Sequence, residues 1–325
     1  MKRLILTSLS GSCLRRFGLA EAVIQFGFRF IAQPLPPAIR LEAFLDARSD
    51  QGPGWHWTDW NPKVGSPRPV RSRHIAFTEY CARYDLIELW FDSTVEDQLQ
   101  LIWLLDFFES HPETAAKLKL RLIGFDLIML ERAPDLKHVP LADISPQELR
   151  TASMCWQAYR ATTPEACIAV LKQNLSAFPL LRPALLDLIQ ELPSRITGLG
   201  ATEIRLLELI GAGFVSTNAL FYLRGFRQRG VFSDMEIGTL LEGLAHGPRP
   251  AITGLDDELR TIDRANLRAR LEAYQRSRLS LTDFGKEVLA HKQDFSRHNP
   301  IDRWWGGTHL TNDNMWRWNP TLMKP

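Results

Sequence analysis

The chain has 325 residues, of which 45% are hydrophobic and 23% charged, with 20 glycines and 20 prolines. This is the composition of an ordinary globular protein, and it excludes a disordered tail, a collagen and a coiled coil. The 39 Lys and Arg against 37 Asp and Glu leave a net charge of +2, so no global field draws the chain onto nucleic acid or an anionic membrane.

The start of the chain superficially resembles a signal peptide, because apolar residues follow Lys2 and Arg3. Thr7 and Ser8 interrupt that stretch, however, and two arginines stand where a cleavage site belongs. We interpret residues 4–7 as a β-strand. Because no apolar run approaches the roughly 18 residues that cross a bilayer, we expect a cytoplasmic protein without membrane contact.

Side chains that bind metals are dispersed along the chain. The four cysteines form no close pair and are predicted to be reduced and mostly buried, and the eight histidines lack metal-ligand spacing. No glycine-rich nucleotide loop, nucleophile elbow or His-Glu-x-x-His motif occurs. The sequence therefore names no reaction and no cofactor, and it predicts no metal site.

The first 130 residues alternate between short apolar runs and helical stretches. This rhythm predicts a Rossmann-like α/β domain with a mainly parallel sheet over residues 1–135. Strands are expected at residues 4–7, 22–28, 86–91 and 119–125, and a helix near 13–17. Residues 51–73 form a loop rich in proline and glycine, and its three tryptophans must lie against something apolar.

The clearest local unit is the strand over 86–91 followed by a helix over 98–108, with Asp92 and Asp97 between them. Ligands of open α/β sheets bind at the carboxyl ends of strands, so both aspartates are candidate ligand-binding residues. The alternative is that they only cap the helix. Ser8 and Ser10, after the first strand, are weaker candidates, because backbone N–H groups at a helix start can hold a phosphate.

From residue 145 the pattern becomes helical. A helical linker region is expected over 140–195, with Ser145 as its first cap, and the segment 196–295 resembles a winged helix. The expected winged-helix elements are helices over 202–209, 217–224 and 233–244, wing strands at 251–253 and 279–281, and a closing helix over 282–289. The charged stretch 256–278 is predicted to be an inserted helix.

The candidate recognition helix does not favour DNA. Residues 233–245 contain Asp234, Glu236 and Glu242 and no Lys or Arg, a charge of −3 that a phosphate backbone repels. Acidic residues offset most of the arginines in the inserted helix. Nucleic acid is therefore disfavoured as a partner, and a packing or partner-binding role is favoured.

The last 30 residues, 296–325, carry four tryptophans and a glycine pair without a helical period. Such a tail is expected to dock into a groove, since it would otherwise be loose in water. We predict that Asp302, Arg303 and His309 form a buried polar network. Two interpretations stay open, because the tail is either a structural clamp between domains or one wall of a pocket.

The aromatic residues of the tail are the candidate surface for a protein partner or a small molecule. Arg317 is expected to stack between Trp316 and Trp318. The partner-binding candidates are Trp304, Trp316, Arg317 and Trp318.

Three segments, 90–101, 198–203 and 301–318, carry a resemblance that covers nearly the full length of the chain. The last of them contains Ile301-Asp302-Arg303-Trp304 and Trp316-Arg317-Trp318. With these residues the chain resembles a bacterial family known as domain of unknown function 1835, with its usual carboxyl-terminal companion region. The resemblance implies a Rossmann-like amino-terminal domain and a helical carboxyl-terminal half, and it supplies no established activity.

The amino-terminal motifs depart from that family. Where the family is similar to Thr-Asn-Gly-Asp, residues 7–10 read Thr-Ser-Leu-Ser, and where it is similar to Trp-Phe-Glu-His-Asp, residues 90–94 read Trp-Phe-Asp-Ser-Thr. The family's Trp-Arg-Asp-x-Leu-His-Glu-Gly-Pro corresponds to residues 26–34, which keep only the proline of those signatures. Acid–base chemistry and metal binding need carboxylates and imidazoles. If the family's crevice is catalytic, this chain is predicted to have lost the chemistry.

Three functions stay open from the sequence. The favoured one is a non-catalytic scaffold with a degenerate α/β crevice that binds a ligand or a protein partner. The second is an enzyme whose site is built from strand-end carboxylates and the tail, which requires those side chains to converge. Its residues would be Asp92, Asp97, Asp302, Arg303 and His309. The third is a winged-helix regulator that binds DNA.

Overall fold

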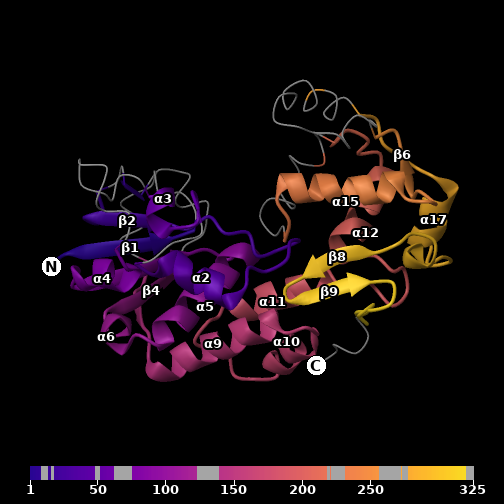
Figure 1. Cartoon of the computed structure of the whole chain (residues 1–325). Coiled ribbons are helices and arrows are strands. Elements are labelled where there is room, and N and C mark those ends of the chain that lie inside the picture. The colour runs from indigo at the N-terminus through magenta and orange to yellow at the C-terminus, as the bar shows by residue number, and fades with distance from the viewer. Residues whose placement is uncertain are drawn as a thin grey trace. The chain divides into compact units, whose positions relative to one another are not determined.

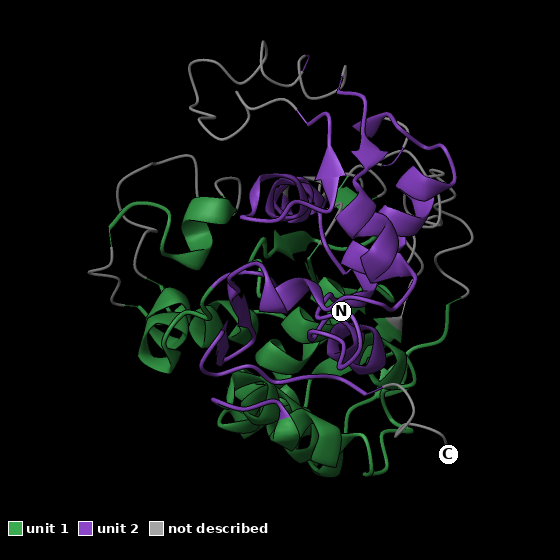
Figure 2. Ribbon diagram, turned by 90° about the vertical axis from the view of Figure 1, so that its right-hand side faces the viewer, with its two compact units in different colours: residues 1–30, 34–161, 165–184 green, residues 31–33, 162–164, 185–325 purple. Residues whose placement is uncertain are grey.

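The computed structural model describes residues 1–8, 14–15, 18–47, 52–61, 75–122, 139–217, 220, 231–255, 272 and 277–319. The chain splits into two compact units, which Figure 2 colours separately. Unit 1 comprises residues 1–30, 34–161 and 165–184, and unit 2 comprises residues 31–33, 162–164 and 185–325. The finer division into four parts that the sequence suggests stays a prediction.

Unit 1 is built on a five-stranded sheet in the order β2-β1-β3-β4-β5 (Figure 1). The first four strands run parallel and the short β5 is antiparallel, so the mixed α/β class and the mainly parallel sheet expected from the sequence are confirmed. The strands are β1 (Arg3–Thr7), β2 (Ala22–Gln25), β3 (Leu86–Phe91), β4 (Leu118–Leu122) and β5 (Ala142–Asp143).

Strand β2 is shorter than the prediction of 22–28. Beyond it, the Phe30 N–H donates to the Glu96 carboxylate at 2.9 Å, and the Gln100 side chain donates to the Phe28 carbonyl at 3.0 Å. Buried backbone groups need partners, and here helix side chains supply them where a neighbouring strand would otherwise do so. The Phe26 N–H still donates to the Thr7 carbonyl of β1 at 2.8 Å, and residues 27–30 then leave the sheet and run along a helix.

That helix, α5, is the central helix of unit 1. It is buried around its whole circumference from Val95 to Leu105, and it packs against β3 and α9. The helices of this unit are α2 (Ala38–Leu45), α3 (Trp57–Trp60), α4 (Phe77–Ala82), α5 (Val95–Glu109), α6 (Pro112–Ala115), α9 (Pro146–Arg160) and α10 (Glu165–Val170). Helix α9 starts at the Ser145 cap that the sequence predicts.

The three tryptophans of the loop 51–73 have the apolar support that the sequence requires. Trp57 is fully buried, and the Trp60 ring lies 4.6 Å from the ring of Phe28. The Trp55 ring lies 6.3 Å from the ring of Phe28, and the guanidinium of Arg40 lies 3.3 Å from the Trp55 centroid. Residues 62–74 of this loop lie outside the described residues.

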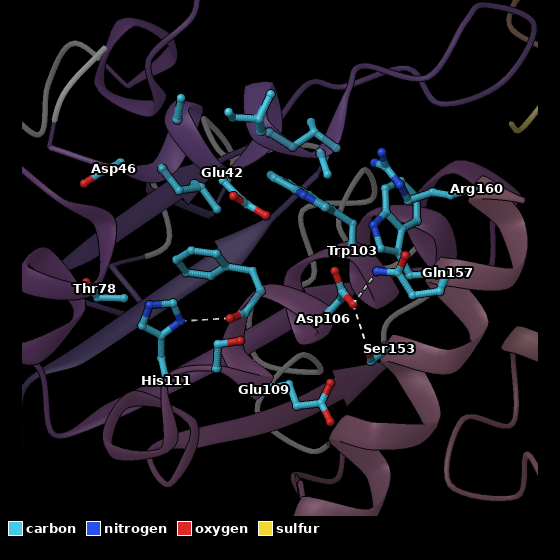
Figure 3. Close-up of a pocket in the computed structure, with 18 of the residues that line it drawn as sticks. Glu42, Asp46, Thr78, Trp103, Asp106, Glu109, His111, Ser153, Gln157 and Arg160 are labelled. Atoms are coloured by element: carbon cyan, nitrogen blue, oxygen red, sulfur yellow. Dashed lines mark hydrogen bonds between the residues drawn. The ribbon is translucent and has the colours of Figure 1, made fainter.

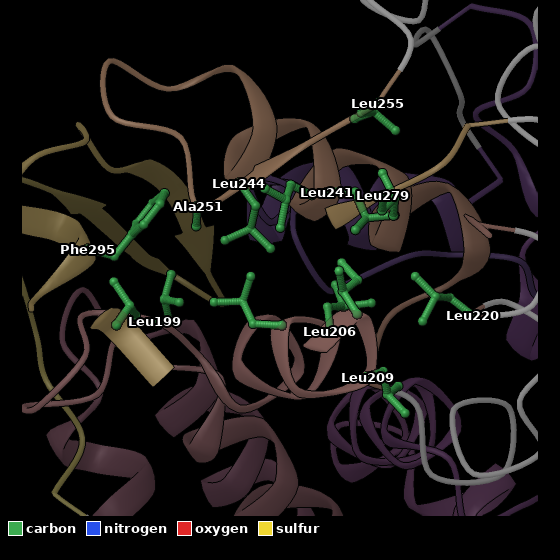
Figure 4. Close-up of a cluster of buried hydrophobic side chains, with 14 of the residues drawn as sticks. Leu199, Leu206, Leu209, Leu220, Leu241, Leu244, Ala251, Leu255, Leu279 and Phe295 are labelled. Carbon is green, nitrogen blue, oxygen red and sulfur yellow. The ribbon is translucent and has the colours of Figure 1, made fainter. Parts of the chain in front are cut away.

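Unit 2 packs helices and a short two-stranded antiparallel sheet around an apolar core (Figure 4). Leu206, Leu241, Leu244 and Ile252 of this core are completely buried. Helix α11 (Leu181–Gln190) leads into this unit. Its other elements are α12 (Ala201–Gly211), α15 (Asp234–His246), β6 (Ile252–Thr253), β7 (Ser280–Leu281), α17 (Asp283–Leu289), the 3₁₀ turn Phe295–Arg297, β8 (Asp302–Trp305) and β9 (Thr308–Thr311).

Side-chain caps set two of these helix boundaries where the sequence predicts them. Ser233 caps α15 in a capping box with Glu236, and Thr282 caps α17 through the Gly285 N–H. Most of the expected helix 217–224, nearly all of the insertion 256–278 and most of the helix near 13–17 lie outside the described residues. In the described ranges no helix is long and apolar enough to cross a membrane.

Two glycines of unit 2 differ in the space around them. A Cβ atom on Gly285, in the first turn of α17, would collide with the Ala251 carbonyl, whereas a Cβ on Gly243 in α15 would meet no atom within 4 Å. We expect Gly285→Ala to lower the free energy of unfolding by about 1–3 kcal/mol through overpacking. Gly243→Ala should raise it by about 0.5–1 kcal/mol, since alanine favours a helix interior.

Urea unfolding of both variants beside the wild type measures these opposite shifts. A loss of stability of the same size in both variants would contradict the close approach of α17 to Ala251.

Candidate functional site

The first candidate site lies at the carboxyl edge of the sheet, between β1 and β3. These strands are parallel neighbours, and the connections leaving them lead to β2 on one side and β4 on the other. Such a reversal is where ligands of open α/β sheets bind. Ser8 follows β1 and Asp92 follows β3, and both lie beside Asp97. The structure thus brings together three of the candidates, while Ser10 lies outside the described residues.

Both aspartates of this edge accept hydrogen bonds from backbone N–H groups. Asp92 accepts the Thr94 N–H at 2.7 Å, and Asp97 accepts the Asp92 N–H at 2.9 Å. Thr94 itself is the N-cap of α5, because its hydroxyl accepts the Asp97 N–H at 3.2 Å. The helix therefore begins at Val95, before the start at 98 that the sequence suggests. Asp92 and Asp97 stabilise this turn. This is the structural role that the sequence offers as the alternative to ligand binding.

Burial changes the ionisation of the same pair. It raises the pKa of Asp92, and the N–H and hydroxyl of Thr94 and a hydrogen bond with Asp97 reduce that rise. Burial, and then the negative charge of Asp92, raise the pKa of Asp97 to about 7, against smaller opposing effects of the hydrogen bonds from Asp92, Ser8 and Thr94. Two adjacent carboxylates in a water-poor site resist double ionisation, so the pair retains a proton up to neutral pH.

This raised pKa predicts a pH dependence of stability. Between about pH 4 and 7 the folded protein keeps a proton on Asp97 that the unfolded chain has released, so the free energy of unfolding falls as pH rises through this window. Asp97→Asn keeps an acceptor for the Asp92 N–H but cannot ionise. We expect it to reduce that fall by on the order of a few kcal/mol, measured by urea unfolding across the window.

Asp313→Asn, which changes an exposed loop carboxyl of unit 2, is the matched control and should follow the wild type. If Asp97→Asn also follows the wild type, the carboxyl pair does not hold the proton.

Residues 26–30 place aromatic rings, not polar groups, in the interior of unit 1. The Trp103 ring lies 5.5 Å from Phe26, 5.0 Å from Phe28 and 5.7 Å from Phe30, and all four side chains are buried. Phe30 also contacts Trp156 of α9 at 4.9 Å. These positions correspond to the charged and turn-forming motif that the family resemblance leads one to expect, and here they form a core.

The second candidate site, which the sequence analysis missed, is a groove of about 840 Å³ between α2, α5 and α9 (Figure 3). We call it the helical groove. Trp103 and Trp156 of the aromatic core belong to its lining, with Glu42, Asp106 and Arg160. Its volume lies within the range of small-molecule sites.

One sequence signal could have located the helical groove. Asp106 and Glu109 are three residues apart and occupy one face of α5, and Glu42 of α2 is followed four residues later by Asp46, which caps the end of that helix. The sequence predicts the helix that carries Asp106, but no helix is predicted over residues 38–45. The acidic residues alone mark two segments of the chain, and only tertiary packing brings these segments together as one groove.

In unit 2 the tail forms a β-hairpin, which the sequence analysis did not predict. Strands β8 and β9 are antiparallel and are joined through Gly306 and Gly307, and Gly306 has a φ of +57°. A two-residue hairpin turn requires this left-handed conformation, which glycine adopts without strain. Successive side chains of β8 consequently point to opposite faces of the hairpin.

The predicted buried network of Asp302, Arg303 and His309 is wrong. Asp302 and His309 do pair at 2.7 Å, but their side chains are 81% and 42% exposed. The His309 ring stacks on Trp304 at 4.4 Å on the same face of the hairpin. Arg303 points to the opposite face, because it is the next residue along β8.

The opposite face of the hairpin is fastened to the start of α12. Arg303 pairs with Glu203 at 2.9 Å and donates to the Glu191 carbonyl at 3.2 Å. The Glu191 carboxylate accepts the Thr202 hydroxyl at 2.6 Å. Burial raises the pKa of Glu191 to about 7; Glu203 adds to that rise, while Thr202 and Arg303 oppose it. Trp305 extends the attachment by donating to the Leu188 carbonyl at 2.7 Å.

Arg317 has a different role from the stacking between Trp316 and Trp318 that the sequence suggests. Its guanidinium pairs with Asp294 at 2.9 Å and donates to the Ser296 hydroxyl at 2.8 Å. The backbone N–H of Trp318 donates to the Pro193 carbonyl, also at 2.9 Å. These contacts make the tail a clamp within unit 2, whereas the clamp between domains that the sequence suggests stays a prediction.

Gly198 shows how tightly this clamp is packed. It has a φ of +70°, and a Cβ atom at this position would collide with Asp294 and Ser296. Two of the segments that carry the family resemblance, 198–203 and 301–318, meet through the Arg303–Glu203 pair. Glu203, Arg303 and Arg317 therefore serve the clamp, whereas Asp302 and His309 do not.

Two arginines of unit 2 allow a matched test of the clamp. Arg303–Glu203 and Arg205–Glu208 have the same N–O distance of 2.9 Å, but the first pair is largely buried and the second exposed. We expect Arg303→Gln to lower the free energy of unfolding by about 3 kcal/mol, because it leaves a buried carboxylate unpaired. Arg205→Gln should cost at most about 0.5 kcal/mol.

Urea unfolding of the two variants measures the difference. Equal losses would mean that the hairpin does not depend on the Arg303 ion pair.

The five residues of the expected composite active site belong to both units. Asp92 and Asp97 lie in unit 1, and Asp302, Arg303 and His309 lie in unit 2. Each group has the partners described above within its own unit. Their convergence therefore stays a prediction.

The remaining side chains of reactive types are either buried and unreactive or far from one another. Cys81, Cys155 and Cys167 are free and buried, and burial raises the pKa of each thiol. In the part of the chain that the structure describes, no three His, Cys, Asp or Glu side chains gather as a metal site. In comparisons with known proteins, no family model matches the chain and no curated protein is significantly similar to it.

Proposed function

We propose that this protein is a non-catalytic scaffold that binds a ligand or a partner, and that its α/β crevice is degenerate. One observation carries the proposal: Asp92 and Asp97, the carboxylates at the carboxyl edge, accept backbone N–H groups at the start of α5. Aromatic side chains at positions 26, 28 and 30 support it, because they supply no acid, base or metal ligand near this edge.

We also propose that unit 1 is a Rossmann-like domain and that the chain is a divergent member of the family of domain of unknown function 1835. The parallel order β2-β1-β3-β4 supports the first part. The residues of the segments 90–101, 198–203 and 301–318 support the second. The free cysteines are consistent with a reducing compartment, and we therefore propose a cytoplasmic location.

For unit 2 we propose a winged-helix-like module that contacts a protein partner in preference to DNA. Helices α12, α15 and α17 with the antiparallel pair β6 and β7 support the winged-helix assignment. Helix α15 carries three acidic residues and no Lys or Arg, which opposes binding to phosphates. On the hairpin, the exposed pair of Asp302 and His309 beside Trp304 offers a contact surface for a partner.

A catalytic role for the carboxyl edge is the competing proposal. The observation that favours it is the pKa of Asp97 near 7, which suits a general acid or base at neutral pH. The same shift is expected of a buried structural carboxyl, however, since burial is its largest cause. Binding and turnover measurements separate the two proposals.

We expect the purified protein to turn over none of ATP, GTP, NAD or NADP, and Asp92→Asn to leave any weak nucleotide affinity unchanged. Equilibrium dialysis measures the affinity, chromatography of the incubated nucleotides measures turnover, and circular dichroism confirms that the variant is folded. Asp313→Asn is the control. Turnover, or tight binding that Asp92→Asn abolishes, would overturn the scaffold proposal.

A further inference from the structure

The helical groove combines an apolar lining with carboxylates. Leu41 and Leu45 of α2 and Trp103 of α5 are buried side chains of the lining, and Phe107 is half-buried. Ile39 also belongs to the lining and is 74% exposed. A ligand that covers such an exposed apolar side chain beside a concave surface removes it from water, which favours binding.

The carboxylates of the groove stand on two helices and at the end of one of them. Glu42 lies on α2 and Asp46 directly follows the last residue of that helix, whereas Asp106 and Glu109 lie on α5. Figure 3 shows the carboxyl groups of Glu42 and Asp106 turned toward the space between these helices. Asp106 is held in place by the Ser153 hydroxyl at 2.7 Å and by the Gln157 amide at 3.0 Å, both from α9. The groove therefore presents fixed negative charge above an apolar surface.

Positive charge in the groove is limited to one end. Among the residues that line it, Arg160 is the single Lys or Arg, so four carboxylates and one guanidinium leave a charge of −3. Arg160 donates to the Pro36 carbonyl at 3.3 Å and lies over the Trp156 ring. Burial lowers the pKa of Arg160, while the charges of Asp106 and Glu42 oppose that change. The groove therefore complements a cation, even with Arg160 present.

His111 lines the groove on the side away from Arg160 (Figure 3). Its Nδ1 lies 2.8 Å from the Phe107 carbonyl, which can only accept, so Nδ1 carries a proton. Its ring packs on the Phe107 ring at 4.5 Å. His111 therefore extends the aromatic lining and adds no negative charge.

The spacing of the carboxylates decides which cation fits. They do not gather as a metal site, since no three His, Cys, Asp or Glu side chains do so among the described residues. Carboxylates spread over α5, α2 and the residue after α2 instead match positive charges that are themselves separated. Methylene groups between those charges would cover the apolar lining.

On the basis of the binding role proposed above, we propose that the helical groove binds a linear aliphatic polyamine. Its ammonium groups pair with Glu42 of α2, with Asp46 at the end of that helix, and with Asp106 and Glu109 of α5. Its three- and four-carbon segments lie on Ile39 and the other apolar side chains of the lining.

Titration calorimetry of the full chain with spermidine at low salt tests this proposal. We expect saturable binding at one site, weakened at least tenfold in the double variant with Glu42→Gln and Asp106→Asn. Asp106→Asn keeps an acceptor for Ser153 and Gln157, so the fold is retained. Glu113→Gln, on α6 outside the groove, is the control and should bind like the wild type.

Two further measurements distinguish a specific binding site from non-specific electrostatic attraction. Ile39→Ser removes exposed apolar surface without touching the core, and it should weaken spermidine binding a few-fold. Mg²⁺ carries charge without methylene groups and should compete poorly. The proposal is overturned if spermidine does not bind, if the double variant binds it as the wild type does, or if Mg²⁺ displaces it at equal charge concentration.

These outcomes are distinct from those of the nucleotide experiment. A failure to bind spermidine removes the polyamine site and leaves the scaffold proposal standing. Nucleotide turnover that depends on Asp92 removes the scaffold proposal, whatever the groove binds.

Discussion

The turn from β3 into α5 is the constraint on which unit 1 depends. Asp92, Thr94 and Asp97 use their side chains to satisfy backbone N–H groups that a helix start leaves free, and this fastens the helix to the end of a central strand. From that anchor α5 carries Trp103 into the aromatic core and Asp106 into the helical groove. A change at the turn would therefore alter both candidate sites.

In both units, each buried charged side chain described here is paired with groups that the tertiary structure brings next to it. Glu88, fully buried on β3, lies between Arg3 at 3.1 Å and Arg121 at 3.0 Å, and it accepts the Trp90 indole N–H. In unit 2, Arg303 does the same for Glu203. Unpaired carboxylates would be costly in these surroundings, so the pairs specify how strands and hairpins pack.

The two candidate sites of unit 1 differ in how accessible their carboxylates are to a ligand. At the carboxyl edge the aspartates are buried and accept backbone N–H groups. In the helical groove Glu42, Asp46 and Glu109 are exposed, and Asp106 is held by neutral donors from α9. A groove with exposed carboxylates above buried rings suits binding, whereas the edge suits a structural role. This contrast supports the scaffold proposal over an enzyme.

The sequence by itself determined the features that depend on neighbours along the chain. Apolar runs located β1, β3 and β4, and Ser145, Ser233 and Thr282 marked helix starts, because strand periodicity and capping are local. Only the tertiary structure decided the early end of β2, the opposite faces of Asp302 and Arg303, and the helical groove. Each of these arises where side chains far apart in sequence become hydrogen-bonding or packing partners, and a linear pattern carries no record of that pairing.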